Sequence, residues 1–113
     1  MWSEITKYII TVEAGEYKKP VYASIQCFDV NNELIAKMYF HEEGRVLPDN
    51  AEGNIVILRY PIAKYPIIVD ILRNEKPVFI NYYEHNKSGY IRTGSEPVGE
   101  GELHLEEERI EIG

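Results

Sequence analysis

Cysteine and long apolar runs are scarce in this sequence of 113 residues, and each scarcity excludes a class of protein. A single cysteine, Cys27, rules out an intrachain disulfide framework. No apolar run approaches the roughly 20 residues that a membrane-spanning helix requires. The first ten residues lack the basic region that opens a secretory signal. From these absences we expect a cytoplasmic protein without a membrane segment.

Charge is distributed unevenly along the chain. The net charge is −7, yet residues 96–113 alone hold seven acidic residues against one basic residue, Arg109. Residues 1–95 hold twelve acidic and eleven basic residues, and their composition is that of an ordinary globular domain. We therefore predict one domain over residues 1–95 and an acidic C-terminal tail over residues 96–113. The tail is either flexible or exchanged as a strand.

The strongest helical pattern lies between residues 60 and 83. Four apolar residues after Pro66 recur at helical spacing: Ile67, Ile68, Ile71 and Leu72. Pro66 suits a first helical turn, and Pro77 indicates that the helix has ended by Lys76. A helix of about ten residues is not stable alone, so it has to pack on a sheet. The β-branched residues leave a buried strand as the alternative.

The remaining pattern is that of strands. Alternation of apolar and polar residues predicts strands at 5–13, 21–29, 33–41, 78–83 and 89–93, and an apolar run predicts a central strand at 54–60. Asn31 and Asn32 predict a tight hairpin turn. We predict an α+β fold of order ββββαββ, with a mainly antiparallel sheet of five or six strands and one helix packed on one face.

One helix covers only one face of such a sheet. The opposite face is predicted to carry apolar and aromatic side chains: Ile9, Tyr22, Phe28, Ile35 and Tyr39. Exposed apolar patches of this size usually contact a partner. We therefore expect a non-enzymatic protein-interaction module that self-associates, as a dimer.

The nine tyrosines suggest a different partner. Tyr83 and Arg92 lie on predicted strands, and aromatic groups beside basic ones can bind single-stranded nucleic acid by stacking and phosphate contact. Tyrosines also pack as cross-strand pairs, which requires no ligand. Nucleic acid is thus an alternative to a protein partner, although the acidity of the chain argues against non-specific duplex binding.

The junction between helix and following strand is a candidate binding corner made of Arg73, Asn74, Glu75 and Lys76. Such a group can bind an anion or a partner carboxylate, and a small enzyme with its site at this corner is the third alternative. The same residues can equally cap the helix and fix the turn.

Motifs for metals and cofactors are missing from the sequence. The three histidines, His41, His85 and His104, lack the spacing of a zinc site and are expected to face solvent. Cys27 is expected to be a small buried hydrophobe. Neither a glycine-rich phosphate loop nor a serine nucleophile elbow is found. We therefore expect no catalytic residue, no metal and no cofactor.

Three strings carry a resemblance to a known family. They are LRNEKPV at residues 72–78, SEPVGEGE at residues 95–102 and ITKYIITVEAGE at residues 5–16. In these strings the chain resembles a family of small, uncharacterised bacterial and archaeal proteins, from its start to about Glu102. The resemblance implies a compact α+β domain and no known cofactor, and it carries over no activity or catalytic residue.

Overall fold

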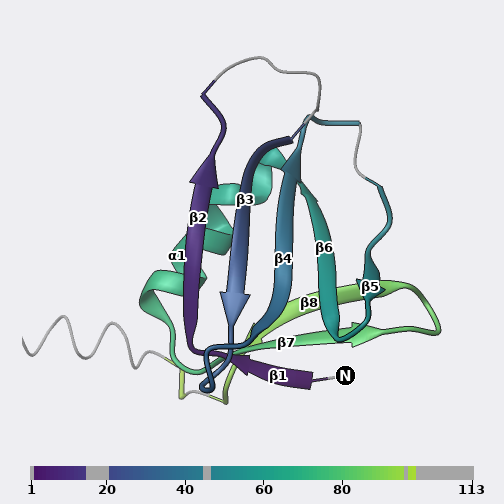
Figure 1. Cartoon of the computed structure of the whole chain (residues 1–113). Coiled ribbons are helices and arrows are strands. Elements are labelled where there is room, and N and C mark those ends of the chain that lie inside the picture. Colours follow the sequence, from purple (N-terminus) through teal and green to yellow (C-terminus); the bar gives the residue numbers. More distant parts are fainter. Residues whose placement is uncertain (1, 15–20, 45–46, 96, 99–113) are drawn as a thin grey trace, which may run out of the picture.

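The computed structural model describes residues 2–14, 21–44, 47–95 and 97–98. Within them the α+β fold class is confirmed (Figure 1). A 3-10 helix, η1 (Ile62–Lys64), leads into the helix α1 (Tyr65–Asn74). The strands are β1 (Trp2–Ile5), β2 (Lys7–Val12), β3 (Val21–Phe28), β4 (Leu34–His41), β5 (Asn50–Glu52), β6 (Ile55–Pro61), β7 (Val78–Tyr83) and β8 (Ser88–Thr93). The predicted acidic tail lies outside the described residues, apart from 97 and 98.

The strands form two sheets where the sequence predicted one. A five-stranded sheet has the order β2-β3-β4-β6-β5, and a three-stranded sheet has the order β1-β7-β8. The strand predicted at residues 5–13 is interrupted at Thr6, so that β1 pairs with β7 while β2 pairs with β3. Pairing is antiparallel except between β4 and β6, which run parallel. Alternation predicts a strand but not its partner, which is why the division was missed.

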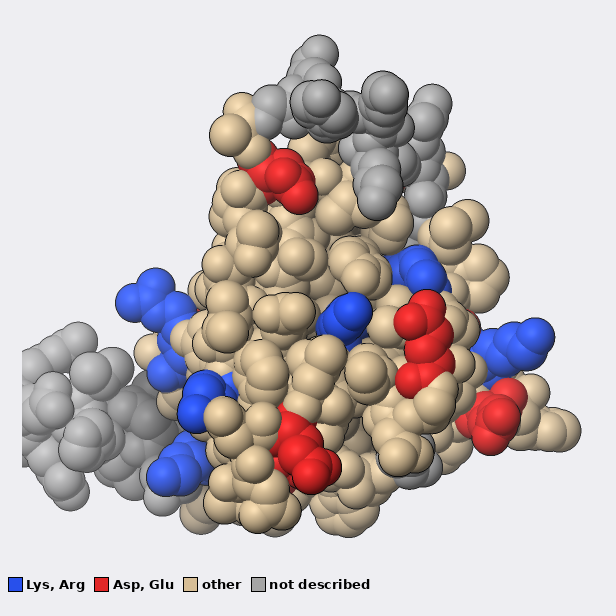
Figure 2. Space-filling view, viewed as in Figure 1, with Lys and Arg blue, Asp and Glu red and all other residues tan. Residues whose placement is uncertain are grey.

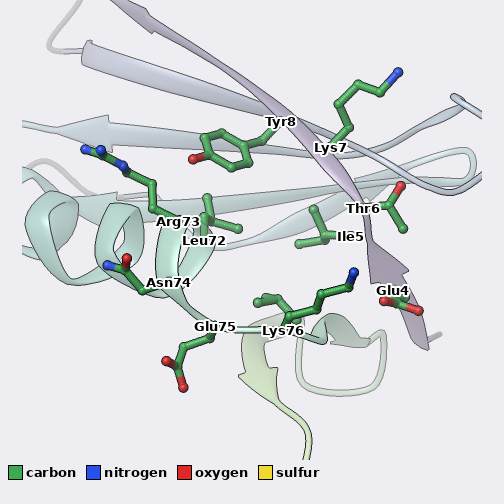
Figure 3. A pocket seen from close by; sticks show the side chains of 11 residues that line it. Glu4, Ile5, Thr6, Lys7, Tyr8, Leu72, Arg73, Asn74, Glu75 and Lys76 are labelled. Carbon is green, nitrogen blue, oxygen red and sulfur yellow. The ribbon is translucent and has the colours of Figure 1, made fainter. Parts of the chain in front are cut away.

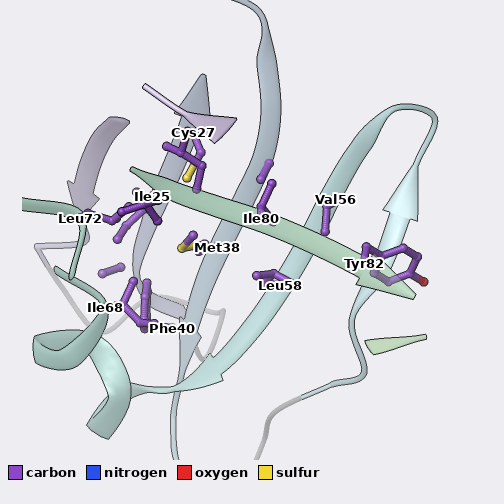
Figure 4. Packing of buried hydrophobic residues seen from close by; sticks show 14 residues of the cluster. Ile25, Cys27, Met38, Phe40, Val56, Leu58, Ile68, Leu72, Ile80 and Tyr82 are labelled. Atoms are coloured by element: carbon purple, nitrogen blue, oxygen red, sulfur yellow. The ribbon is translucent and has the colours of Figure 1, made fainter. Parts of the chain in front are cut away.

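The core lies between the five-stranded sheet and the two elements that cover its inner face, α1 and the three-stranded sheet (Figures 1 and 4). Ile68 and Leu72 of α1 are buried, as are alternate residues of β7. The five-stranded sheet contributes Ala23, Ile25, Cys27, Ala36, Met38, Phe40, Val56 and Leu58. The helix therefore covers part of the inner face, and the smaller sheet covers the rest.

The predicted helix is confirmed, with one residue of its apolar stripe misplaced. Pro66 lies in the first turn, and the helix ends before Glu75, whose N–H donates to the carbonyl of Ile71 at 3.0 Å. Ile67 is exposed. At 3.6 residues per turn it lies about 120° from the centre of the buried stripe formed by Ile68 and Leu72. No helix among the described residues has the length and apolarity needed to cross a bilayer.

Asp49 connects the two sheets by hydrogen bonds. Its Oδ1 accepts from the backbone N–H of Arg59 in β6 at 2.8 Å, and its Oδ2 accepts from the N–H of Gly89 in β8 at 3.0 Å. The Arg59 side chain in turn donates to the carbonyl of Pro48 at 2.7 Å and to the side chain of Asn50. One carboxylate thus holds β8 against β6.

Gly89 marks the closest approach of the smaller sheet to β6. A Cβ at this position would lie 2.5 Å from Cδ2 of Leu58 and 2.8 Å from the carbonyl oxygen of Asn81. The second contact is with backbone, which cannot rotate away as a side chain can. Asn81 belongs to β7, so a Cβ at position 89 would disturb the pairing of β7 with β8 as well as contact Leu58 of β6.

His41 differs from its predicted solvent-facing position, because it is only 5% exposed. It ends β4 and is flanked on both sides, by Val21 of β3 and Pro61 of β6. Neither ring nitrogen has a hydrogen-bond partner within the described residues. Burial lowers the pKa of His41, and the positive charge of Arg59 lowers it further. The folded protein therefore holds this imidazole in its neutral form.

We expect Gly89→Ala to lower the free energy of unfolding by about 1–3 kcal/mol, because the added methyl group has no room. Urea denaturation monitored by circular dichroism measures this change. Ser88→Ala is the matched control, since Ser88 is exposed on the same strand and should stay within about 0.5 kcal/mol of the parent chain. Equal stabilities of the two variants would contradict the close approach.

His41 should make folding sensitive to mild acid. In the unfolded chain it takes up a proton near the ordinary pKa of about 6.5, whereas the folded protein resists protonation. Below that pH the unfolded state binds more protons, so the free energy of unfolding falls by up to about 1.4 kcal/mol per pH unit. Urea titrations at pH 7.5 and 5.5 should show a smaller fall in His41→Phe than in the parent chain. The same fall in the free energy of unfolding in both chains would contradict the assignment of this pH dependence to His41.

Candidate functional site

The four predicted corner residues line a cavity of about 360 Å³. It opens where three segments meet: the end of α1, the break between β1 and β2, and the start of β7 (Figure 3). Its apolar wall is made of the buried side chains of Ile5, Leu72 and Val78. The predicted corner is thus one side of a partly open cavity, which the sequence pattern did not indicate.

The corner residues divide into two pairs by orientation. Asn74 donates from Nδ2 to Oδ1 of Asp70 at 2.7 Å, one turn back in the helix. Glu75 follows the last helical residue, and its carboxylate is directed away from the cavity in Figure 3. These two residues complete the helix end, as the alternative interpretation expected. Arg73 and Lys76 remain as the positive groups of the cavity.

The opposite wall comes from the first strands. Tyr8 extends toward Arg73 at one end of the cavity, and Lys76 reaches toward Ile5 at the other (Figure 3). Lys7 also borders the cavity, but its amine donates to Oδ1 of Asn32 at 2.6 Å and so points elsewhere. The cavity therefore combines an apolar wall with a hydroxyl group and two cations.

Tyr83 and Arg92, the other predicted site residues, lie on the outer face of the three-stranded sheet and not at the cavity. Strand register places six further side chains on that face, which we call the aromatic face together with these two: Trp2, Glu4, Phe79, Asn81, Ser88 and Tyr90. Trp2 and Phe79 meet edge to face at 4.9 Å, and Tyr83 and Tyr90 lie 5.8 Å apart between ring centroids. The structure thus gathers four aromatic rings around Asn81.

Hydrogen bonds hold part of the aromatic face in place. The hydroxyl groups of Tyr83 and Tyr90 lie 3.0 Å apart, and Asn81 donates from Nδ2 to the Tyr90 hydroxyl at 3.1 Å. The bond to Tyr90 raises the pKa of Tyr83, and the bond to Tyr83 lowers the pKa of Tyr90. Trp2 was missed because β1, with four residues, is too short for a clear alternation.

The outer face of the five-stranded sheet forms a third surface, the open face, on which Ile9, Tyr22, Phe28 and Tyr39 lie. Ile9 is 50% exposed and Tyr22 44% exposed. Among the described residues no helix or strand covers this face (Figure 1), and Figure 2 shows its charged groups scattered among uncharged ones. Ile35, predicted on this face, packs against the buried cluster because the strand register shifts between Cys27 and Phe28.

Reactive side chains are not gathered at any of these surfaces. Cys27 is fully buried, and burial raises the pKa of its thiol to about 12, so it stays protonated. The described residues hold no cluster of three or more histidine, cysteine, aspartate or glutamate side chains that could bind a metal ion. The cavity offers cations and a hydroxyl group that can bind an anion, beside the carboxylate of Glu4.

Comparison with protein-family models finds no match for this chain, and comparisons with curated proteins and with solved structures find none either. What the chain binds has therefore to follow from its own surfaces, which are the cavity, the aromatic face and the open face.

Proposed function

We propose that this protein is a non-enzymatic interaction module that self-associates as a dimer through the open face. The supporting observation is the contrast between the two faces of the five-stranded sheet. The inner face is covered by α1 and the three-stranded sheet, whereas no described element covers the outer one. Half-exposed Ile9 and Tyr22 on that outer face are the side chains that a partner would remove from water.

The shape of the open face suits a second copy of itself. Cross-strand register puts Ile9, Gln26 and Lys37 in one row across three neighbouring strands, and Ile57, which ends the row on β6, is buried and offers no surface to a partner. Tyr39 lies in the next row, on the same face. Sheets of this kind pack face to face with nearly aligned strands, and a dimer about a twofold axis uses the same patch on both subunits.

Charge on the open face is compatible with self-association. Lys37 and Arg59 project from it, while Glu13 and Glu52 lie on the same side at the ends of neighbouring strands. Both signs are therefore present on one patch. A copy rotated about a twofold axis can set a cation against a carboxylate instead of repelling its partner.

We further propose that the module acts in the cytoplasm. Its single cysteine is a free, buried thiol in the structure, and a reducing compartment matches a chain that uses no disulfide. A catalytic role for the corner formed by residues 73–76 is not proposed. Asn74 and Glu75 are engaged in the helix end and are not directed into the cavity.

Replacing Ile9 or Tyr22 with lysine should disrupt the dimer, because each change sets like charges against each other across the twofold axis. We expect sedimentation equilibrium to show a dimer for the parent chain and a dissociation constant raised at least about tenfold in Ile9→Lys and Tyr22→Lys, a cost of about 1.4 kcal/mol. Val30→Lys is the matched control, since Val30 is 81% exposed but lies in the turn beyond β3.

Two results would count against this proposal. One is a parent chain that remains monomeric at millimolar concentration. The other is a control variant that dissociates as readily as the two variants of the open face, which would show that added charge acts without regard to position.

A second candidate function, binding of single-stranded nucleic acid, is favoured by the aromatic face. Trp2, Tyr83 and Tyr90 expose their rings there, and Arg92 lies beside Phe79 on the same side. Rings of this kind stack on bases, and an arginine contacts phosphate. The net charge of −7 opposes the approach of a polyanion, so self-association remains the first proposal.

Fluorescence anisotropy with a short labelled oligothymidylate at low salt tests the second candidate. If it is correct, Trp2→Ala and Tyr90→Ala should each weaken binding by about 1–3 kcal/mol, the contribution of one stacked base. Tyr22→Ala on the open face is the control and should bind like the parent chain. Absence of a salt-dependent signal from the parent chain would exclude this function.

A further inference from the structure

The cavity at the end of α1 has the properties of a small-molecule site. Its volume of about 360 Å³ falls within the range of roughly 300–1,000 Å³ typical of such sites. Thr6, Leu72 and Lys76 border it from three segments that are separate along the chain. Residues of β1, β2, α1 and β7 border this partly open space, so a ligand would not have to order a loop on binding. The cavity is independent of the open face through which we propose dimerisation.

The base of the cavity is suited to an apolar group of a ligand. Ile5, Leu72 and Val78 line it and belong to the continuous buried core. Each side chain is less than a tenth exposed, so these walls are held by packing behind them. A hydrocarbon or aromatic body seated there would replace water against apolar surface, which favours binding.

The rim of the cavity is suited to a negatively charged group of a ligand. Arg73 and Lys76 lie on it, and within the described part of the chain neither is held by a carboxylate. The hydroxyl group of Tyr8, directed toward Arg73, is a further donor (Figure 3). A guanidinium group binds a carboxylate through two parallel hydrogen bonds, and the ammonium group at the other end of the cavity adds positive charge that favours an anion. Glu4, also on the rim, disfavours a ligand with more than one negative charge.

A structural role explains only part of this arrangement. Arg73 lies in the last turn of α1, where a cation offsets the negative end of the helix dipole. Lys76 follows the helix in an extended segment, and Tyr8 comes from β2, so neither contributes to the helix end. Helix capping also does not account for an open volume between them.

We propose that this cavity binds a small monocarboxylate with a compact apolar body, such as a medium-chain fatty acid or an aromatic acid. The apolar body contacts Ile5, Leu72 and Val78, and the carboxylate lies at the end of the cavity where Arg73 and the Tyr8 hydroxyl donate to it, while Lys76 adds positive charge at the other end. Neither the sequence patterns nor the comparisons assign a ligand to this chain, and the proposal stands whether or not the protein dimerises.

Titration of the ¹⁵N-labelled full chain with octanoate, followed by heteronuclear NMR, tests the proposal. Saturable amide shifts are expected at residues 5–8 and 72–78. Octan-1-ol, which keeps the chain length but lacks the carboxylate, should bind at least tenfold more weakly, and so should inorganic phosphate, which lacks the apolar body. Arg73→Gln should weaken octanoate binding at least fivefold, and Lys76→Gln, at the other end of the cavity, should weaken it less.

Lys37→Gln is the matched control, because it removes one positive charge from the open face and leaves the cavity intact. It should bind octanoate like the parent chain, and the NMR spectra report whether each variant is folded. Equal affinity for octanoate and octan-1-ol would overturn the proposal, as would amide shifts confined to residues outside the cavity. Unchanged affinity in both Arg73→Gln and Lys76→Gln would do the same.

Discussion

The carboxylate of Asp49 holds the two sheets of this protein together at their crossing. It accepts one backbone hydrogen bond from β6 and one from β8, at the point where Gly89 lets the strands approach without a side chain between them. A buried backbone N–H without an acceptor is costly, so the bridge also completes the hydrogen bonding of both strands. The positions of the aromatic face and of one cavity wall depend on this contact, because both belong to the sheet that it fixes.

Local features of the fold could be predicted because local chemistry determines them. Pro66 and Pro77 bracket the helix, and the structure ends α1 between them. The turn at Asn31 and Asn32 forms as expected, with Asn32 at a φ of 66°, a conformation that asparagine tolerates. The short strand β5 was not predicted, since its three residues show no period.

The tertiary arrangement of the strands could not be predicted from the sequence pattern. Alternation says which side chains share a face but not which strand lies alongside, so neither the second sheet nor the parallel pairing of β4 with β6 could be predicted. The same limit applies to the candidate site. Arg73 and Lys76 were recognised as charged groups at a helix end, but the apolar wall that makes them part of a cavity comes from Ile5, about seventy positions earlier in the chain.

The interruption of the strand at Thr6 determines how the two sheets are connected. Trp2 and Ile9 belong to one short, nearly continuous stretch of backbone, yet they face solvent on different sheets. Thr6 itself borders the cavity between them. Because β1 pairs with β7 and β2 pairs with β3, a single residue joins an edge strand of each sheet, and the two solvent-facing surfaces are linked covalently beside the cavity.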